Sequence, residues 1–179
     1  MQGLFLLTPL CNLSRLPFKG TIEMINGFPP IADVNATILI LGSMPSVTSI
    51  QRWEYYGNKS NDFWPIISSV FDVEFFTYQD KIDAAIFHRI AIWDVFASCN
   101  REQSKDHTIT DETFNDFSSF FITHPHITKI IANGKKAHKS LLSIQDSLPS
   151  IEIFLAVSTS RAYPLPFEKK LALWRDVLT

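Results

Sequence analysis

The chain has 179 residues, of which 46% are hydrophobic and 13% aromatic, so it is long enough to bury one sizeable core. Its net charge of −2 argues against a protein that coats nucleic acid electrostatically, and no apolar run is long enough to span a bilayer, so no membrane partner is expected. The two cysteines, Cys11 and Cys99, exclude a disulfide framework and a four-cysteine iron–sulfur cluster, and they indicate a reducing cytoplasm.

Hydrophobic patterning predicts strands that alternate with helices. In chain order the predicted elements are strand 37–41, helix 61–71, helix 80–89, strand 90–96, helix 111–122, strand 129–132, helix 134–144, strand 151–157 and helix 166–178. This alternation predicts an α/β fold with three α/β/α layers and a central, mainly parallel four-stranded sheet.

One stretch between these elements is strongly polar. Residues 98–111 are predicted to form an exposed functional loop, because nothing in them looks able to fill a core. Thr110 or Asp111 is expected to cap the helix that follows.

The most informative motif follows the first strand. It reads Gly-Ser-Met-Pro-Ser at 42–46 and continues at 55–64 as Tyr-Tyr-Gly-Asn-Lys-Ser-Asn-Asp-Phe-Trp. Ligands of α/β proteins sit beyond the carboxyl ends of the strands, which is where this segment is expected. Its neutral hydrogen-bonding groups (Ser43, Asn58 and Asn61) and its flat rings suit a planar, polar, uncharged ligand such as a nucleobase.

This block resembles the first motif of the uracil-DNA glycosylase superfamily, and within it most closely the hypoxanthine-DNA (deoxyinosine) glycosylase branch. Three further pieces match in order. The first runs from Trp-Asp-Val at 93–95 through Ser-Cys-Asn-Arg at 98–101 to Ser-Lys-Asp at 104–106. The second is Ile-Ile-Ala-Asn-Gly at 130–134. The third is Ser-Thr-Ser at 158–160, which precedes a helix with Lys169 and Trp174.

The resemblance begins just after Met24 and runs to the C-terminus. We therefore expect residues 24–179 to form a single glycosylase-like domain and residues 1–23 to be an N-terminal extension, with Met24 a candidate for the true start. A signal peptide is disfavoured, because the apolar stretch 1–10 has no basic n-region and the first basic residues, Arg15 and Lys19, come after it.

The resemblance implies a DNA repair enzyme that hydrolyses the N-glycosidic bond of a flipped, deaminated base, with hypoxanthine foremost. Its substrate would be double-stranded DNA, its product an abasic site, and it would act as a cytoplasmic monomer without a cofactor. Two alternatives stay open. One is a uracil or G:U/T mismatch-specific DNA glycosylase, and the other is a non-catalytic nucleic-acid-binding member of the superfamily.

For catalysis the resemblance points to Asn61, with Asn58 as a second candidate. An amide offers both a donor and an acceptor, so it can bind a base edge or orient a water molecule. Asn61 equally fits a helix cap. Asp106 matches a position whose carboxylate could stabilise an oxocarbenium-like state, and the alternative is an ion pair between Asp106 and Arg101.

For the base itself, the resemblance assigns stacking to Tyr56, whose alternative is a plain core aromatic. The strand-end turn of Ser43, Met44 and Pro45 would hold a base carbonyl, and Asn133 would touch the base edge unless it only forms a turn. Several branches place Asn or Asp where this chain has Met44. The hypoxanthine branch also lacks a polar residue there, so Met44 favours that branch and argues against strong uracil activity.

For DNA, the resemblance implies that Ser158, Thr159 and Ser160 enter the minor groove and contact phosphates, together with Ser46 of the turn. Arg161 departs from the proline common in the family, and it would plug the gap left by the flipped base or pair with a phosphate. Residues 134–179 carry seven Lys or Arg against four Asp or Glu.

A histidine pair, His124 and His126, suggests zinc, but too few further ligands stand nearby in the sequence. We therefore expect no metal site.

Overall fold

The computed structural model describes residues 23–102 and 104–179, so all but the last residue of the predicted extension 1–23 lies outside the described residues. The central sheet is parallel and has the strand order β3-β2-β6-β7. Its strands are β2 (Ile38–Gly42), β3 (Ile90–Asp94), β6 (Lys129–Asn133) and β7 (Glu152–Ala156). The four predicted strands of the parallel sheet are thereby confirmed.

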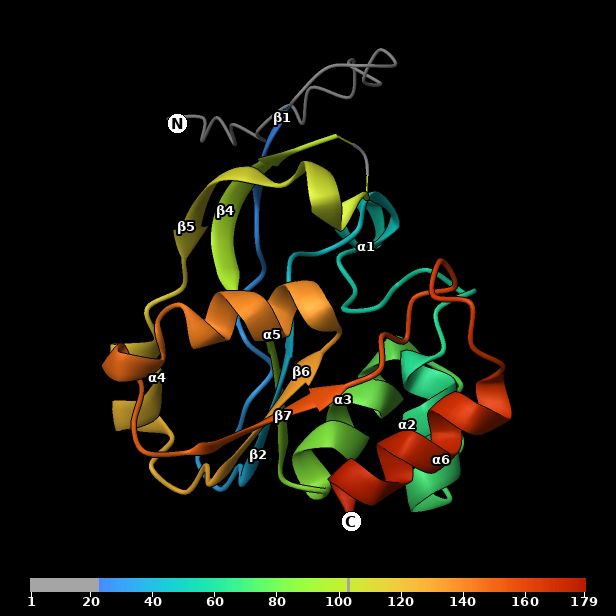
Figure 1. Ribbon diagram of the computed structural model, residues 1–179. Helices are drawn as coiled ribbons and strands as arrows, with labels where there is room; N and C mark the ends of the chain where they lie inside the picture. The colour runs from blue at the N-terminus through green and yellow to red at the C-terminus, as the bar shows by residue number, and fades with distance from the viewer. Residues whose placement is uncertain (1–22, 103) are drawn as a thin grey trace, which may run out of the picture.

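Helices cover both faces of this sheet (Figure 1). One side carries α2 (Phe63–Phe71), α3 (Tyr78–Phe87) and α6 (Phe167–Leu178), and the other carries α4 (Phe117–Thr123) and α5 (Lys135–Leu142). All five residues of β3 are buried, as expected for a strand with helices on both faces. The predicted three-layer α/β/α architecture is confirmed.

A second, antiparallel sheet was not predicted. It has the order β1-β4-β5 and consists of β1 (Glu23–Asn26), β4 (Phe96–Arg101) and β5 (Thr110–Phe114). The predicted strand 90–96 is therefore two strands, because the chain leaves the parallel sheet after Asp94 and enters the antiparallel sheet at Phe96.

The exposed loop predicted for residues 98–111 is wrong. Cys99 and Arg101 lie in β4 and are 0% and 2% exposed, and Ile109 is also buried. This segment fills part of the core because β4 pairs with both β1 and β5. A short 3-10 helix, η1 (Asp106–Thr108), lies between β4 and β5.

The helix predicted for 111–122 is wrong in its first half, where β5 runs instead. The true cap of α4 is Asp116, whose carboxylate accepts a hydrogen bond from the Ser119 amide at 3.0 Å. Besides η1, two further short helices in the described residues were not predicted, namely α1 (Val47–Arg52) and η2 (Gln145–Ser147).

The strand order places a topological switch point between β2 and β6, because the chain winds outward from this pair in opposite directions. A crevice forms at the carboxyl ends of the strands where the direction changes, and such crevices hold the ligands of open α/β sheets. No helix in the described residues is long and apolar enough to cross a bilayer.

Candidate functional site

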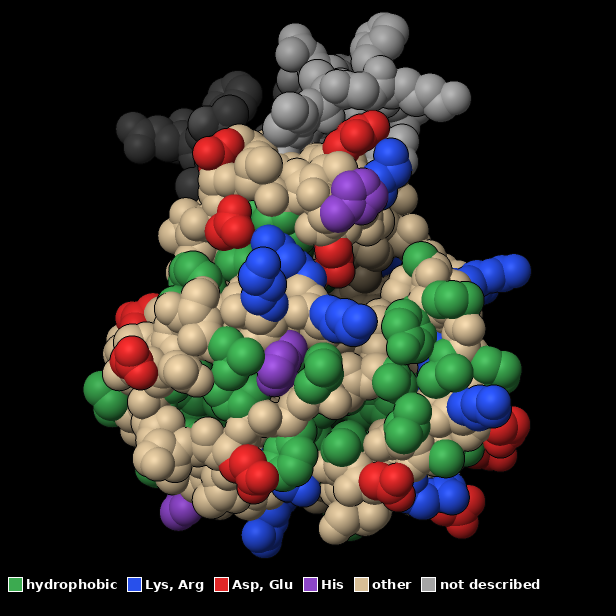
Figure 2. All heavy atoms as spheres, in the orientation of Figure 1, with side chains coloured by type: hydrophobic (Ala, Val, Ile, Leu, Met, Phe, Trp, Pro, Cys, Tyr) green, Lys and Arg blue, Asp and Glu red, His purple; other side chains and the backbone are tan. Residues whose placement is uncertain are grey.

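A cavity of about 480 Å³ opens at the carboxyl ends of the parallel strands. Figure 2 shows the surface hollowed between the region of α1 and η1 and the loop after β7. The cavity is lined by every site residue that the sequence singled out: Ser43, Met44, Pro45, Ser46, Tyr56, Asn58, Asn61, Asp106, Asn133, Ser158, Thr159, Ser160 and Arg161.

A buried arginine holds the turn after β2. The Arg101 guanidinium donates hydrogen bonds to the carbonyls of Met44 (3.4 Å) and Pro45, and it is 2% exposed. It also forms an ion pair with Asp106 at 3.9 Å, as the alternative for that residue predicted. The Ser43 hydroxyl donates to the same Asp106 carboxylate at 2.9 Å, so Asp106 is fixed beside the turn while about half of its side chain stays exposed.

The next segment is tied down by hydroxyl groups. Ser46 caps α1, its hydroxyl oxygen accepting from the Ser49 amide at 3.1 Å, so this DNA-binding candidate is engaged locally. The Val47 amide donates to the Ser104 hydroxyl at 3.0 Å, and the Gly57 amide donates to the Ser49 hydroxyl at 3.1 Å. These bonds anchor both ends of the loop that carries the aromatic pair at 55 and 56.

One face of the Tyr56 ring is covered by another aromatic side chain. The ring stacks on Phe63 with ring centroids 3.8 Å apart, so only its other face is available to a ligand. The Tyr56 hydroxyl is buried and makes no hydrogen bond to any described residue. Burial and the nearby Asp94 raise the pKa of this phenol above its ordinary value, while the amide of Asn133 lies close enough to oppose the rise slightly.

Asn61 and Asn58 take different positions. The Asn61 carbonyl oxygen accepts from the Phe63 amide at 3.0 Å, just before α2, so the cap-like role is present. Its NH₂ group makes no hydrogen bond within residues 23–102 and 104–179. Asn58 is exposed, and its carbonyl oxygen accepts from both the amide and the hydroxyl of Ser60, at 3.0 and 2.9 Å.

Both polar groups of the Asn133 side-chain amide form hydrogen bonds with Thr159. Its NH₂ donates to the Thr159 hydroxyl at 2.9 Å, and its oxygen accepts from the Thr159 amide at 3.0 Å. The side chain thus fastens the end of β6 to the loop after β7. Gly134 makes this close approach possible, because it has a φ of +98° and an added Cβ would lie 3.2 Å from Cβ of Ser158.

The loop that carries the second motif is fixed by a buried lysine. Lys170 of α6 donates to Asp62 at 2.7 Å and to the Ser160 carbonyl at 3.0 Å. Within the loop the Ser158 hydroxyl accepts from the Ser160 amide at 3.2 Å. Arg161 follows at the cavity rim with its side chain exposed.

Asp94, the last residue of β3, was not predicted as a site residue. It lines the cavity, is 4% exposed, and its Oδ2 makes no hydrogen bond to a described residue. Burial raises the pKa of this carboxyl to about 7, with Arg101 opposing the rise and Asp106 adding to it. The available signal was an acidic residue directly after the apolar run 90–93, which puts it at the carboxyl end of a parallel strand.

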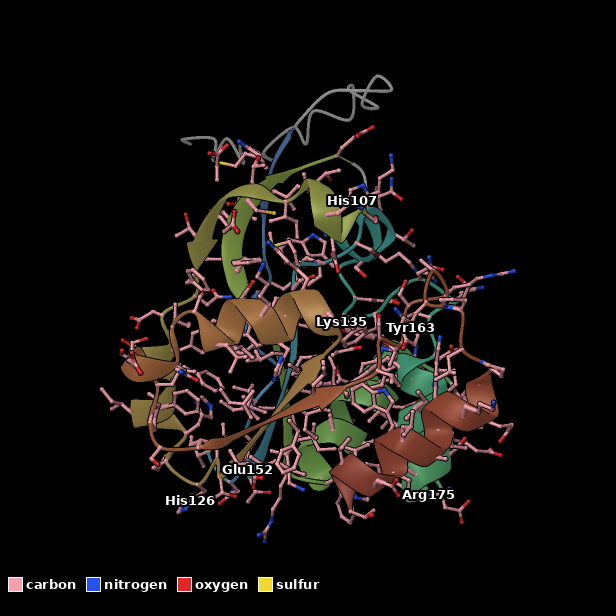
Figure 3. All side chains as sticks on the ribbon, in the orientation of Figure 1. His107, His126, Lys135, Glu152, Tyr163 and Arg175 are labelled. Carbon is pink, nitrogen blue, oxygen red and sulfur yellow. The ribbon has the colours of Figure 1, made fainter. Side chains whose placement is uncertain are left out.

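An exposed cation from α5 lies outside the cavity lining but near its mouth (Figure 3). Lys135, at the start of α5, lies near the hollow with His107 and Tyr163 around it (Figure 3). Lys135 is exposed, whereas its neighbour Lys136 forms an ion pair with Glu112 at 3.3 Å. No group of three or more His, Cys, Asp or Glu side chains in the described part of the chain is arranged to hold a metal ion.

Comparisons with known proteins agree on one family. A family model described as the uracil DNA glycosylase superfamily matches residues 29–178. Two proteins named hypoxanthine DNA glycosylase, from Methanosarcina barkeri and Methanosarcina acetivorans, are 41% and 42% identical over 113 residues, which is 62% of this chain and 72% of each relative.

The fold comparison extends further along the chain. The solution NMR structure of a candidate uracil DNA glycosylase from Methanosarcina acetivorans matches with a TM-score of 0.75 and 34% identity, over 87% of this chain and 97% of that one. The family match covers most of the chain and includes every segment that lines the cavity. This chain belongs to the uracil DNA glycosylase superfamily and is a DNA glycosylase.

Proposed function

We propose that this glycosylase removes hypoxanthine from double-stranded DNA. It hydrolyses the N-glycosidic bond of a flipped deoxyinosine and leaves an abasic site. It acts as a monomer, through residues 24–179, and uses no cofactor. It is monofunctional, because none of the side chains assigned to the reaction is an amine nucleophile.

The main support for this proposal is the hydrogen bonding of the Asn61 side-chain amide. Its oxygen is taken by the Phe63 amide at 3.0 Å, which leaves the NH₂ group as a donor at the cavity. A departing base gains negative charge as the glycosidic bond breaks. A positioned donor stabilises that charge, and loss of one such donor slows an enzyme by roughly 10²–10³-fold.

The turn after β2 supports hypoxanthine over uracil. Met44 has no group that can activate water, and its carbonyl is held by Arg101 at 3.4 Å. The two relatives that are 41% and 42% identical bear the name hypoxanthine DNA glycosylase, which supports the same base.

The remaining site residues fit the steps of base flipping. Tyr56, whose ring is packed on Phe63, meets the edge of the extruded base with its hydroxyl, and the hydroxyls of Ser158 and Ser160, with the cations of Arg161 and Lys135, contact the DNA backbone. Asp106 lies beside Ser43 with its carboxylate partly exposed, where it stabilises positive charge on the sugar electrostatically. Flipping costs a few kcal/mol, which these contacts offset.

A gel assay tests the proposal. Labelled duplexes containing inosine, uracil or xanthine, and an undamaged duplex, are incubated with the protein in EDTA and then cleaved at abasic sites with alkali. We expect the inosine strand to be cut fastest and the undamaged strand not at all. A strict requirement for zinc or magnesium, faster cutting of uracil, or inactivity on every deaminated base would overturn the proposal, and the last result would favour a binding protein.

A further inference from the structure

Two buried oxygens at the cavity have no partner among the described residues. They are Oδ2 of Asp94 and the hydroxyl of Tyr56. Buried polar groups are hydrogen-bonded in the great majority of cases, so an unpaired pair beside one cavity points to a ligand that completes them.

Both groups lie against the same backbone position. Gly42 of β2 stands beside Asp94 of β3 in the parallel register. A Cβ at Gly42 would overlap Oδ1 of Asp94 and would lie 3.4 Å from the Tyr56 hydroxyl. The missing side chain of Gly42 therefore makes room for the carboxyl group and the phenol together.

Neighbouring polar groups of the cavity are already committed. The Asn133 amide is bonded twice to Thr159, and the Ser43 hydroxyl donates to Asp106. Asp94 Oδ2 and the Tyr56 hydroxyl are thus the buried oxygens at the cavity that make no hydrogen bond to a described residue, and the second N–H of Asn133 lies near the Tyr56 hydroxyl.

We propose that Asp94 and Tyr56 read the N–H and C=O edge of the flipped base, the Asp94 carboxylate accepting from the ring N–H and the Tyr56 hydroxyl donating to the adjacent carbonyl oxygen. This inference rests on the proposed function and names how the same site chooses its base. Hypoxanthine presents N1–H beside O6, whereas adenine presents a bare N1 acceptor beside an NH₂ donor. Adenine would place its bare N1 against the ionised Asp94 carboxylate, acceptor against acceptor, so this carboxylate selects the deaminated purine over its parent. The Tyr56 hydroxyl, which can donate or accept, adds a bond to O6 of hypoxanthine.

The charges around Asp94 make this recognition depend on pH. Arg101 of β4 favours the carboxylate, while Asp106 of η1 disfavours it, and the phenols of Tyr55 and Tyr56 also face it. Burial outweighs Arg101 and brings the pKa of Asp94 to about 7. The fraction of Asp94 that is ionised, and so can accept from the ring N–H, therefore increases as the pH rises through about 7. The rate of hypoxanthine excision should increase with it.

A recognition role also differs from a structural role in its effect on stability. Tyr56→Phe removes an unpaired buried oxygen and Asp94→Asn removes a buried negative charge, so each relieves a desolvation penalty in the free protein. Asp94→Asn and Tyr56→Phe should therefore melt at or above the temperature of the parent while working more slowly.

The test measures single-turnover excision from matched duplexes containing inosine or adenine between pH 6 and 9, together with the melting temperature. We expect Asp94→Asn and Tyr56→Phe each to slow inosine excision at least tenfold at pH 8. We expect Asp94→Asn also to flatten the pH profile and to lower the preference for inosine over adenine.

Tyr55→Phe is the matched control. The Tyr55 hydroxyl donates to the carbonyls of Phe28 and Pro29, both at 3.2 Å, so its loss should lower the melting temperature and leave the rate per folded molecule unchanged.

Parent-like rates, selectivity and pH profile in both Asp94→Asn and Tyr56→Phe would overturn the inference. So would a lower melting temperature, or a failure to fold, in both variants with an unchanged rate per folded molecule. A parent protein that excises hypoxanthine normally in those experiments keeps the proposed function intact. A parent protein inactive on every deaminated base rejects the proposed function itself, and the inference with it.

Discussion

Nζ of Lys170 lies 2.7 Å from Oδ2 of Asp62, and only 1% of the Lys170 side chain is exposed. The contact joins α6 to the start of α2, one residue after Asn61. The same ammonium group also holds the Ser160 carbonyl at 3.0 Å. A single buried cation thus fixes the proposed catalytic amide relative to the loop proposed to contact phosphates.

Lys170→Met should destabilise the protein strongly, because it leaves Asp62 and the Ser160 carbonyl without their partner. Breaking a buried ion pair costs roughly 3–5 kcal/mol, and we expect about 3 kcal/mol here, since Asp62 keeps partial contact with water. Urea unfolding measures the difference. Lys169→Met is the control on the exposed neighbour and should change stability by less than about 0.5 kcal/mol. Equal effects of the two variants would contradict the assignment.

Asn61→Asp should separate the catalytic role of Asn61 from its cap-like role. Aspartate keeps the oxygen that accepts from the Phe63 amide, and a negative charge is favoured at a helix N-terminus, so folding should be preserved. It lacks the NH₂ donor, and we expect single-turnover excision of hypoxanthine to fall at least about a hundredfold.

Two alanine variants complete this comparison. Asn61→Ala should lose a similar factor in rate and, in addition, about 1 kcal/mol of stability from the lost cap. Asn58→Ala should affect the rate far less, because Asn58 is exposed and bonded to Ser60. An active Asn61→Asp, or a larger loss at Asn58, would show that the wrong amide was chosen.

Asp94 should make the unliganded protein less stable as the pH rises. Its pKa is about 7 in the folded chain against an ordinary value of 3.8, so the native state binds the proton more tightly than the unfolded state. The free energy of unfolding therefore falls between about pH 4 and pH 7 and the contribution levels off above that range.

Asp94→Asn should remove this dependence. We expect its stability advantage over the parent to be about 3 kcal/mol larger at pH 8 than at pH 4.5, as measured by urea unfolding at both values. A stability difference that does not change with pH would mean that the carboxyl is already ionised at low pH in the folded protein.

Arg161→Ala should weaken binding to duplex DNA and affect a short single strand much less, since no base has to leave a stack there. If Arg161 contacts a phosphate, the slope of log affinity against log salt should become shallower by about one unit. If it fills the gap left by the base, the slope should hold while excision slows most on stable base pairs.

Arg175→Ala is the matched control, because it also removes one arginine charge. Arg175 lies in α6, away from the loop that carries Arg161 (Figure 3). Among the residues that the structure describes, the Arg175 guanidinium donates to the Ser69 carbonyl at 3.3 Å, so affinity and salt slope should match the parent. Parent-like behaviour of Arg161→Ala in affinity, slope and rate would make Arg161 an ordinary surface residue.

Local patterns predicted the parallel sheet because its strands are apolar runs, such as 38–41, that alternate with predicted helices along the chain. The antiparallel sheet escaped prediction because its strands are polar and are stabilised by partners far away in sequence. Residues 110–114 are mostly exposed and become β5 only through pairing with β4. Tertiary pairing here overrides local propensity.

The sequence predicted which residues meet around one cavity, because these residues follow strand ends. What could not be predicted is which side-chain groups stay free. Asn133 bonds to Thr159 of another segment and Ser46 caps α1, whereas Oδ2 of Asp94 is buried and makes no hydrogen bond to a described residue. Such commitments depend on neighbours brought together by folding, as with Arg101, which was expected in a loop and lies buried beside Met44.

The most direct test of the central claim is chromatographic detection of the free base released from an inosine-containing duplex in EDTA. The parent protein should release hypoxanthine in a one-to-one ratio with alkali-labile abasic sites, and folded Asn61→Asp should release at least about a hundredfold less in the same time. Strand cleavage without free hypoxanthine, or equal release by the parent and Asn61→Asp, would contradict the account.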